Sequence, residues 1–513
     1  MASPLEDDIF EKLRSQVKPE EQEKRIQELN KRLHEQYEKQ QLRETAILES
    51  NNTLPVTISE VRVLHAVNTR RSFLQGIVKP LLRRDAEEPF TLREARETID
   101  SVGKKLDKLG IFQSPITAYV DKSEKSDPST TPTDLSVYFH AKERGRYTIK
   151  TGTEAGHSEG SAYADVQFRN LFGGAEAINA HASLGTRTRS AYSAIFDTPI
   201  FGNPDRKWQV GGLASSTLKP WASHEERLRG AFSKIQIVTE NDHIHEFGYS
   251  GSWRTITGLA ENASPTVRLD AGDSFKSSLT HTFINDKRDY PLLPNSGYLF
   301  KTVSEIAGFG PLRGDVGFFK TELESQAAIP IPLPGIEGSS GVSFNLGLRG
   351  GMLYPLTAGG GDIPLQSRLN DRFQLGGPTD VRGFKISGLG PHDAGDAVGG
   401  DVYAAGGASL LMPLPRVGKD TPLRLQAFVN AGRLLSLKGK TKDGQMTSEE
   451  VHSNMKRTLS ELRNGLPSAS AGLGLVYAHP MARFELNFSL PLVMRRGEEG
   501  RKGVSFGVGI SFL

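Results

Sequence analysis

The residues that could carry covalent or metal chemistry are few, and they do not form a known kind of active site. The 513-residue sequence has no cysteine, which excludes disulfides, thiolate nucleophiles and cysteine-bound metals. It contains neither a Walker phosphate loop nor an H-E-x-x-H zinc motif. The one close histidine pair, His243 and His245, has no evident third ligand, so an ordinary strand pair is favoured over a metal site. We therefore expect a protein that is not an enzyme and that holds no metal or cofactor.

A different kind of chemistry, the burial of a charge, is predicted at Arg382. This arginine stands in a segment that resembles a turn, Val381–Phe384. A guanidinium that is removed from water needs partners for its five N–H donors and for its charge. Asn430 could accept a hydrogen bond from Arg382, Phe428 could stack against it, and Glu485 could balance its charge. We expect Arg382 to lock a loop in place; direct contact with a substrate chain is the alternative.

The scaffold that must hold these residues is predicted to be a sheet of alternating strands. From about residue 147 onward, strand patterns recur every ~15–30 residues without a helical domain between them. Near the end of the chain, apolar residues alternate with polar ones: Phe484, Leu486, Phe488 and Leu490 with Arg483, Glu485, Asn487 and Ser489. We count 16 such strands, more than a soluble sandwich, the alternative, usually has. A closed barrel leaves no strand edge unpaired, as lipid requires. Residues 146–513 are therefore expected to form a 16-stranded transmembrane antiparallel β-barrel.

Two regions precede the predicted barrel. Residues 1–51 are dense in Glu, Lys, Gln and Arg and carry apolar residues at helical spacing: Ile26, Leu29, Leu33 and Tyr37. A solvated helix or a disordered arm is expected there, and a helix that binds a partner is the alternative. Residues 52–145 are predicted to form a small α/β domain of order β-α-α-β-β. Its elements are a strand near 56–63, helices near 70–83 and 91–109, and strands near 116–120 and 135–141.

The composition limits the class of protein. Hydrophobic residues make up 37% of the chain, mean hydropathy is −0.39 and no run of 18 apolar residues occurs, so no transmembrane helix is expected. A barrel strand needs only about 10 residues, half of them facing lipid. The net charge of +3 is too small to predict nucleic-acid binding. Residues 1–8 resemble neither a secretory signal nor a transit peptide, which points away from a bacterial outer membrane.

An even number of strands places both ends of the barrel wall on one side of the membrane. By this parity, residues 352–399 are expected to form a loop on the side far from the N-terminal domain. Residues 436–467 belong to the same side, and they include a predicted helix near 449–463. The last strand is expected to run to Leu513.

The first and last strands are predicted to meet in a weak seam. The first strand, Tyr147–Thr153, is short. The last strand contains Gly507 and Gly509, and glycine weakens the packing of a strand. A short strand beside a glycine-rich one should part more easily than the other junctions of the barrel.

Several segments resemble one known family. Residues 381–384 match the (V/I)-R-G-(F/Y) signature of the outer-membrane β-barrel assembly superfamily and stand before the fifth-last predicted strand. Asn170–Gly174 resembles the family's turn after the second strand, and the order of elements in 52–145 resembles a POTRA domain. Phe428–Gly432 resembles the family's F-x-D-x-G strand, with Asn430 in place of Asp. A further similarity, to the family's R-D…P-x-x-G motif, comprises Arg288, Asp289, Pro294 and Gly297.

The resemblance implies roles for particular residues. In this family the signature lies at the tip of the sixth outer loop, which folds back into the lumen. The loop motif is then Val381, Arg382, Gly383 and Phe384, and its partners in the lumen are Phe428, Asn430, Gly432 and Glu485. The last strand is similar to the β-signal of mitochondrial barrel precursors, which implies a lateral gate between the first and last strands. Its residues would be Tyr147, Thr148, Ile149, Lys150, Thr151, Gly152 and Thr153, with Ser505, Gly507, Val508, Gly509, Ile510 and Phe512.

The single POTRA-like domain, the missing secretory signal and Asn430 most resemble the mitochondrial branch of the family, the sorting and assembly machinery. That branch implies a protein of the mitochondrial outer membrane with its N-terminal domain in the intermembrane space. The implied function is to insert and fold β-barrel precursor proteins by β-augmentation at the gate. The implied partners are those precursors, accessory outer-membrane assembly subunits and the lipid bilayer. The alternative is a passive pore or a protein-translocating barrel of the same superfamily.

Overall fold

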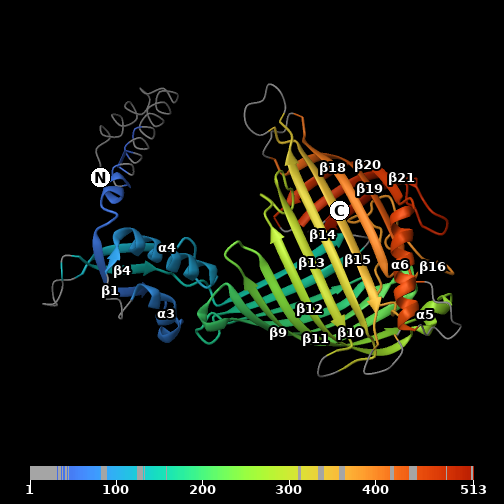
Figure 1. Ribbon diagram of the computed structural model, residues 1–513, viewed down its shortest axis with the longest axis horizontal. Helices are drawn as coiled ribbons and strands as arrows, with labels where there is room; N and C mark the ends of the chain where they lie inside the picture. The colour runs from blue at the N-terminus through green and yellow to red at the C-terminus, as the bar shows by residue number, and fades with distance from the viewer. Residues whose placement is uncertain are drawn as a thin grey trace, which may run out of the picture. The chain divides into compact units, whose positions relative to one another are not determined.

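The computed structural model describes most of the chain as two compact units (Figure 1). The described residues are 45–82, 89–123, 131, 133–156, 159–309, 313–332, 340–357, 364, 366–415, 421–437, 447–480, 482–509 and 512–513, with single residues between 32 and 43. The helical spacing predicted at Ile26, Leu29, Leu33 and Tyr37 lies outside them. The larger unit comprises Arg144–Leu513 with the short segments Asn68–Phe73 and Lys108–Ile111; the rest forms the smaller unit. Within the described ranges, no helix is long and apolar enough to cross a membrane.

The smaller unit is built on a four-stranded sheet of order β2-β1-β4-β3, in which β1 and β4 are parallel. Helix α4 presents one apolar face, Ala95, Ile99, Val102 and Leu106, which is buried. At its start, Thr91 and Glu94 exchange hydrogen bonds of 3.3 and 3.1 Å, as the capping-box pattern predicts. The predicted order is confirmed, with a short extra strand, β2. The elements are β1 (Pro55–Leu64), α3 (Arg71–Val78), η1 (Lys79–Leu81), β2 (Phe90–Thr91), α4 (Leu92–Lys108), β3 (Thr117–Lys122) and β4 (Asp134–His140).

The larger unit is a 16-stranded sheet in which all neighbouring strands that pair are antiparallel, as predicted. Strands follow one another in sequence order around the sheet, so each pairs with its neighbours along the chain. The strands are β5 (Tyr147–Gly156), β6 (Glu159–Arg169), β7 (Ala177–Gly185), β8 (Thr188–Pro199), β9 (Arg206–Lys219), β10 (His224–Val238), β11 (Ile244–Thr257), β12 (Gly272–Asp286), β13 (Gly297–Ala307), β14 (Phe318–Pro330), β15 (Ser343–Pro355), β18 (Val402–Pro413), β19 (Leu423–Leu435), β20 (Ser468–His479), β21 (Ala482–Val493) and β22 (Gly503–Gly509).

The sheet curls into a transmembrane barrel whose two faces differ in chemistry. On β21, Leu486 and Phe488 are 47% and 49% exposed, whereas Glu485, Asn487 and Ser489 are buried. Because side chains alternate between the faces of a strand, the apolar set points outward to lipid and the polar set into the lumen. The alternation of apolar and polar residues predicted for this segment is therefore confirmed: it separates the lipid-facing from the lumen-facing side chains.

Helices α5 (Pro265–Leu269) and α6 (Ser448–Asn464) lie in loops at one end of the barrel (Figure 1). The connection between β15 and β18, residues 356–401, is the longest and is named the lumen loop below; it contains the short strands β16 (His392–Asp393) and β17 (Asp396–Ala397). It begins four residues later than predicted because β15 continues to Pro355. Helix α5 follows β11, and α6 lies within one residue of its predicted limits.

The two end strands differ from their prediction. Strand β5 runs from Tyr147 to Gly156, so it is three residues longer than predicted. Strand β22 ends at Gly509 after seven residues and does not run to Leu513. Ile510 lies outside the described residues. Phe512 was predicted on the last strand, but it lies outside β22 and is buried in the lumen, where its ring and main chain contact Arg382 and Gln326.

Candidate functional site

Arg382, in the lumen loop, is fully buried. Its Nε and Nη2 donate to the two carboxylate oxygens of Glu485 at 2.9 and 3.1 Å. Its Nη1 donates to Oδ1 of Asn430 at 3.1 Å and to the main-chain oxygen of Leu513 at 3.0 Å. The ring of Phe428 lies 4.8 Å from its guanidinium carbon. The structure thus brings Arg382 together with the three partners that the sequence suggested for it.

Glu485 is the charge at the centre of this arrangement. Arg483, on the same strand, donates from Nη2 to Glu485 at 2.6 Å, and Asn487 donates to its other oxygen at 2.7 Å. One carboxylate therefore serves two guanidinium groups, while Asn430 supplies an acceptor without a charge. Charges removed from water are tolerated only when they are paired and hydrogen-bonded. We call Arg382, Glu485, Asn430 and Phe428 the Arg382 clasp.

Two glycines let the loop approach the wall closely. A Cβ at Gly432 on β19 would lie 2.9 Å from Val381, which is itself fully buried. Gly383 has φ +82°, a conformation that side chains disfavour, and a Cβ there would lie 2.9 Å from Ser470. Phe384 is buried in the same apolar cluster as Val381. The loop motif is therefore held by shape as well as by charge.

A second ionic contact, which the sequence analysis missed, fastens the base of the lumen loop. Arg254 on β11 donates from Nη1 to Oδ1 of Asp371 at 2.6 Å, and both side chains are almost fully buried. Nζ of Lys276 lies 3.6 Å from the same oxygen and 2.7 Å from Glu305. The alternation of β11 places Arg254 on the lumen side, which was a usable signal. Its partner lies in a loop, where no periodicity identifies it.

The two end strands, β5 and β22, meet without a shared register. Their Cα atoms approach within 8 Å. Seven residue pairs join β22 to β21, and ten join β5 to β6. Every other pair of consecutive strands in the sheet is also joined by residues in register, whereas among the described residues no such pair joins β5 to β22. We call this junction the seam.

The residues predicted for the gate are divided between the two strands. Tyr147 and Ile149 are 71% and 64% exposed, Thr148 accepts a hydrogen bond from Arg169 at 3.0 Å, and Gly152 packs on Tyr163. Those on β5 are Tyr147, Thr148, Ile149, Lys150, Thr151, Gly152 and Thr153, and those on β22 are Ser505, Gly507, Val508 and Gly509.

The glycines of β22 have a steric role that the sequence did not reveal. A Cβ at Gly507 would lie 3.3 Å from Pro378 in the lumen loop, and one at Gly509 would lie 3.3 Å from Thr379. Both would also come within 3.5 Å of the Phe512 ring. The lumen loop therefore packs on the inner face of β22, and a larger residue would push it away.

Two other sequence patterns lie in strands of the barrel wall. Gly503–Gly507 matches the letters G-x-S-x-G, but it lies inside β22 and not at the turn from a strand to a helix that a nucleophile elbow requires. A ring nitrogen of His245 lies 3.3 Å from one of His281. No group of three or more metal-binding residues occurs among the residues that the structure describes.

Known proteins of one family resemble this chain along most of its length. Residues 170–512 match the Omp85 superfamily domain. A SAM50-like protein of Schizosaccharomyces pombe is 39% identical over 468 residues, 91% of this chain and 93% of that protein. The sorting and assembly machinery component 50 homolog B of Xenopus laevis is 36% identical over 82% of each chain. The sorting assembly machinery 50 kDa subunit of Saccharomyces cerevisiae is 33% identical over 89% of this chain and 95% of that one.

A solved structure shares the fold. BamA from Haemophilus ducreyi, in a form lacking POTRA domains 1–3, superposes with a TM-score of 0.66 at 14% identity, covering 88% of this chain and 84% of that chain. At that identity the likeness concerns the fold alone. The domain match spans more than half of the chain, and relatives above 30% identity cover nearly all of it. The chain therefore belongs to the Omp85 superfamily.

Proposed function

We propose that this protein folds β-barrel precursor proteins and inserts them into the membrane by pairing their β-signal with a strand edge at the seam. The protein lies in the mitochondrial outer membrane with its N-terminal domain in the intermembrane space, as its sorting and assembly relatives do. Its barrel serves in the assembly of other barrels. The observation that carries the finer proposal is the missing register between β5 and β22.

The mechanism follows from what lipid demands of a strand. Backbone N–H and C=O groups that face hydrocarbon without a partner cost several kcal/mol each. When β5 and β22 part, the edge of β5 becomes the nearest set of partners for an incoming strand. A precursor strand that pairs there satisfies the backbone groups of β5 and those on its own facing edge. Further hairpins then add until the new barrel closes on itself and leaves, and the step needs neither a nucleotide nor covalent chemistry.

The Arg382 clasp supports this mechanism by keeping the interior fixed. The lumen loop packs on β19, β20 and β21 through the clasp and on β11 through Asp371. A wall that is supported from inside can lose one junction without collapsing inward. The same filling argues against the alternative of a passive pore, because Arg382 and Glu485 occupy the lumen and are fully buried.

The proposal is tested by closing the seam with a disulfide. The native chain has no cysteine, so an introduced pair is the only one present. One cysteine replaces Thr151 on β5, and its partner replaces Ser505 or Val508 on β22 in two separate variants. After oxidation, the locked barrel should remain folded, and insertion of a radiolabelled precursor into purified outer membranes should stop. Adding reductant should restore it.

A matched pair on the neighbouring junction controls for the effect of a disulfide. Thr151 lies directly opposite Ala164 on β6. Strands β5 and β6 are paired in register, so the proposed mechanism does not require them to separate. Thr151→Cys with Ala164→Cys should therefore insert precursors at the normal rate in both redox states. Normal insertion by a fully locked seam would contradict the proposal.

A further inference from the structure

Phe512 and Leu513, the described residues after β22, are held in the lumen. Phe512 and Leu513 are only 7% and 8% exposed. The ring of Phe512 lies beside two guanidinium groups, 5.7 Å from that of Arg382 and 5.0 Å from that of Arg483. The main chain of Leu513 donates to Thr379 at 3.3 Å and accepts from Arg382 at 3.0 Å. These contacts direct the chain beyond β22 toward the lumen loop.

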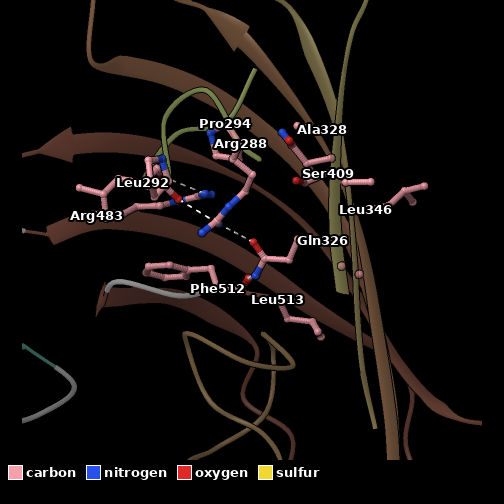
Figure 2. Close-up of a pocket in the computed structure, with 15 residues that line it drawn as sticks. Arg288, Leu292, Pro294, Gln326, Ala328, Leu346, Ser409, Arg483, Phe512 and Leu513 are labelled. Carbon is pink, nitrogen blue, oxygen red and sulfur yellow. Dashed lines mark hydrogen bonds between the residues drawn. The ribbon is translucent and has the colours of Figure 1, made fainter. Parts of the chain in front are cut away.

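A single glutamine links these residues to a distant turn. Gln326, on β14, donates from Nε2 to the main-chain oxygen of Phe512 at 3.0 Å. Its Oε1 accepts from Nη1 of Arg288 at 2.8 Å. Arg288 is fixed in turn by Asp286, to which Nε and Nη2 donate at 2.9 and 2.7 Å. Figure 2 shows Arg288 reaching toward Gln326, with Phe512 close by.

The turn between β12 and β13, residues 287–296, is itself anchored inside the barrel. Leu292 and Leu293 are buried and pack with Leu411, Val476 and Ala478 from β18 and β20. The main-chain oxygen of Leu292 accepts from Arg483 at 3.5 Å, and that of Pro294 accepts from Ser343 at 3.3 Å. Since β12 and β13 lie several strands away from β18 and β20 in the sheet, the turn crosses the lumen. Arg288 therefore stands on a fixed support.

Little space remains between the turn and Phe512. The cavity that Arg288, Gln326, Arg483 and Phe512 line has a volume of about 40 Å³. A volume of this size holds one or two water molecules. Phe512 lines this small cavity, and the contacts of its ring and main chain hold it there.

We infer that Gln326 and Arg288 are positioning residues that keep Phe512 and Leu513 inside the lumen and away from the first residues of β5. This inference rests on the proposed function, because it explains how the edge of β5 stays available for a precursor. Strands β5 and β22 are antiparallel, so β22 ends where β5 begins, at Tyr147. A chain that continued beyond Gly509 as a strand would offer its own backbone groups to that edge. Held by Gln326, Phe512 directs its main-chain oxygen into the lumen instead.

The test removes the hydrogen bonds of Gln326 and follows where residue 513 goes. Gln326→Leu keeps the approximate size of the side chain and loses both its donor and its acceptor. A cysteine at Leu513 reports release through its rate of reaction with a water-soluble maleimide. A second cysteine at Thr148 reports return to β5 through disulfide formation. Both rates should rise at least five-fold in Gln326→Leu, the factor that loss of about 1 kcal/mol of hydrogen bonding gives, and precursor insertion should fall.

The control makes the same change at another half-buried glutamine. Gln209 lies on β9 between the exposed Trp208 and Val210, so its side chain faces the lumen. Gln209→Leu should leave both rates and insertion unchanged. If Gln326→Leu fails to give a folded barrel, Gln326→Asn replaces it, because that side chain stays polar but is too short to reach both partners.

The possible outcomes separate the inference from the function on which it rests. Unchanged labelling and disulfide rates in a folded Gln326 variant would overturn the inference. Faster labelling with normal insertion would support the positioning role of Gln326 and contradict pairing at β5 as the mechanism. Slower insertion with unchanged labelling would show that the turn only closes the lumen, and the inference would fail.

Discussion

The Arg382 clasp and the seam differ in how their polar groups are paired. In the clasp, Arg382 donates four hydrogen bonds to Glu485, Asn430 and Leu513, all of them out of contact with water. At the seam, no residues of β5 and β22 stand in register within the described part of the chain. Each backbone hydrogen bond that a junction lacks lowers the free energy of opening it by about 0.5–1.5 kcal/mol. Two or three such bonds decide whether thermal motion can open it.

The strongest contacts of this barrel therefore lie in the lumen, at the Arg382 clasp, and its weakest junction lies in the wall, at the seam. The lumen loop is fastened to β21 by Glu485 and to β11 by Asp371, strands on separate parts of the barrel. The seam lies beside β21, so the firmest contacts and the weakest junction are neighbours. A barrel arranged this way can open without losing its fold.

The largest effect is expected from removing the centre of the clasp. Arg382→Ala leaves Glu485 with one guanidinium instead of two, that of Arg483, and removes a donor from Asn430. Breaking a buried charge pair in this way costs about 3–5 kcal/mol. The lumen loop should then lose its protection from added protease. Lys385→Ala is the control, because that side chain is 58% exposed and its ion pair with Glu499 lies at the surface. Equal protection of the loop in the two variants would contradict this account.

A smaller effect is expected at the second contact of the loop. Arg254→Ala removes the hydrogen bond to Asp371, and bonds to charged groups contribute about 1.5–3 kcal/mol. Lys276, 3.6 Å from the same carboxylate oxygen, should compensate in part. The melting temperature of the purified barrel should fall less than in Arg382→Ala, while disulfide formation across the seam stays normal. A larger fall than in Arg382→Ala would show that the Arg254–Asp371 contact stabilises the lumen loop more than the Arg382 clasp does.

A still smaller change is expected where the clasp and the seam adjoin. Gly507→Ala places a Cβ 3.3 Å from Pro378, so the lumen loop must shift by a few tenths of an ångström. Overpacking of this kind costs about 1–3 kcal/mol, and the small displacement puts the effect near the lower limit. Gly160→Ala on β6 is the control, since a Cβ there meets nothing within 4 Å. Denaturant unfolding should separate the two, and equal stability would refute the steric role of Gly507.

The smallest effect is expected for Asn430→Asp. The new carboxylate keeps the acceptor for Arg382 and adds a charge beside two guanidinium groups that now share Glu485. It gives up a hydrogen bond of 3.5 Å from Asn430 to the main chain of Asp380. These changes oppose each other, so the free energy of unfolding should move by less than about 1 kcal/mol. A barrel that no longer folds would mean that the clasp depends on a neutral residue at 430.

Much of the fold could be predicted because apolar and polar residues alternate along the strands of the barrel wall. The same alternation identified the clasp, since Phe428, Asn430 and Glu485 all fall on lumen-facing positions of their strands. Asp371 could not be found in this way, because it lies in a loop without periodicity. The end of β22 was predicted wrongly for a related reason. The alternation continues through Phe512, and a sequence pattern does not show whether a strand end stays on the wall or turns inward.

The most direct test of the central claim is to ask which strand touches a precursor during insertion. A photoreactive amino acid is placed at Ile149 on β5, and the same probe is placed at Tyr249 on β11 as a control away from the seam. A precursor carrying a β-signal is arrested during insertion, and the sample is irradiated. The account predicts a crosslink from Ile149 to the last strand of the precursor and none from Tyr249. Equal crosslinking from both positions, or none from Ile149, would contradict pairing at the seam.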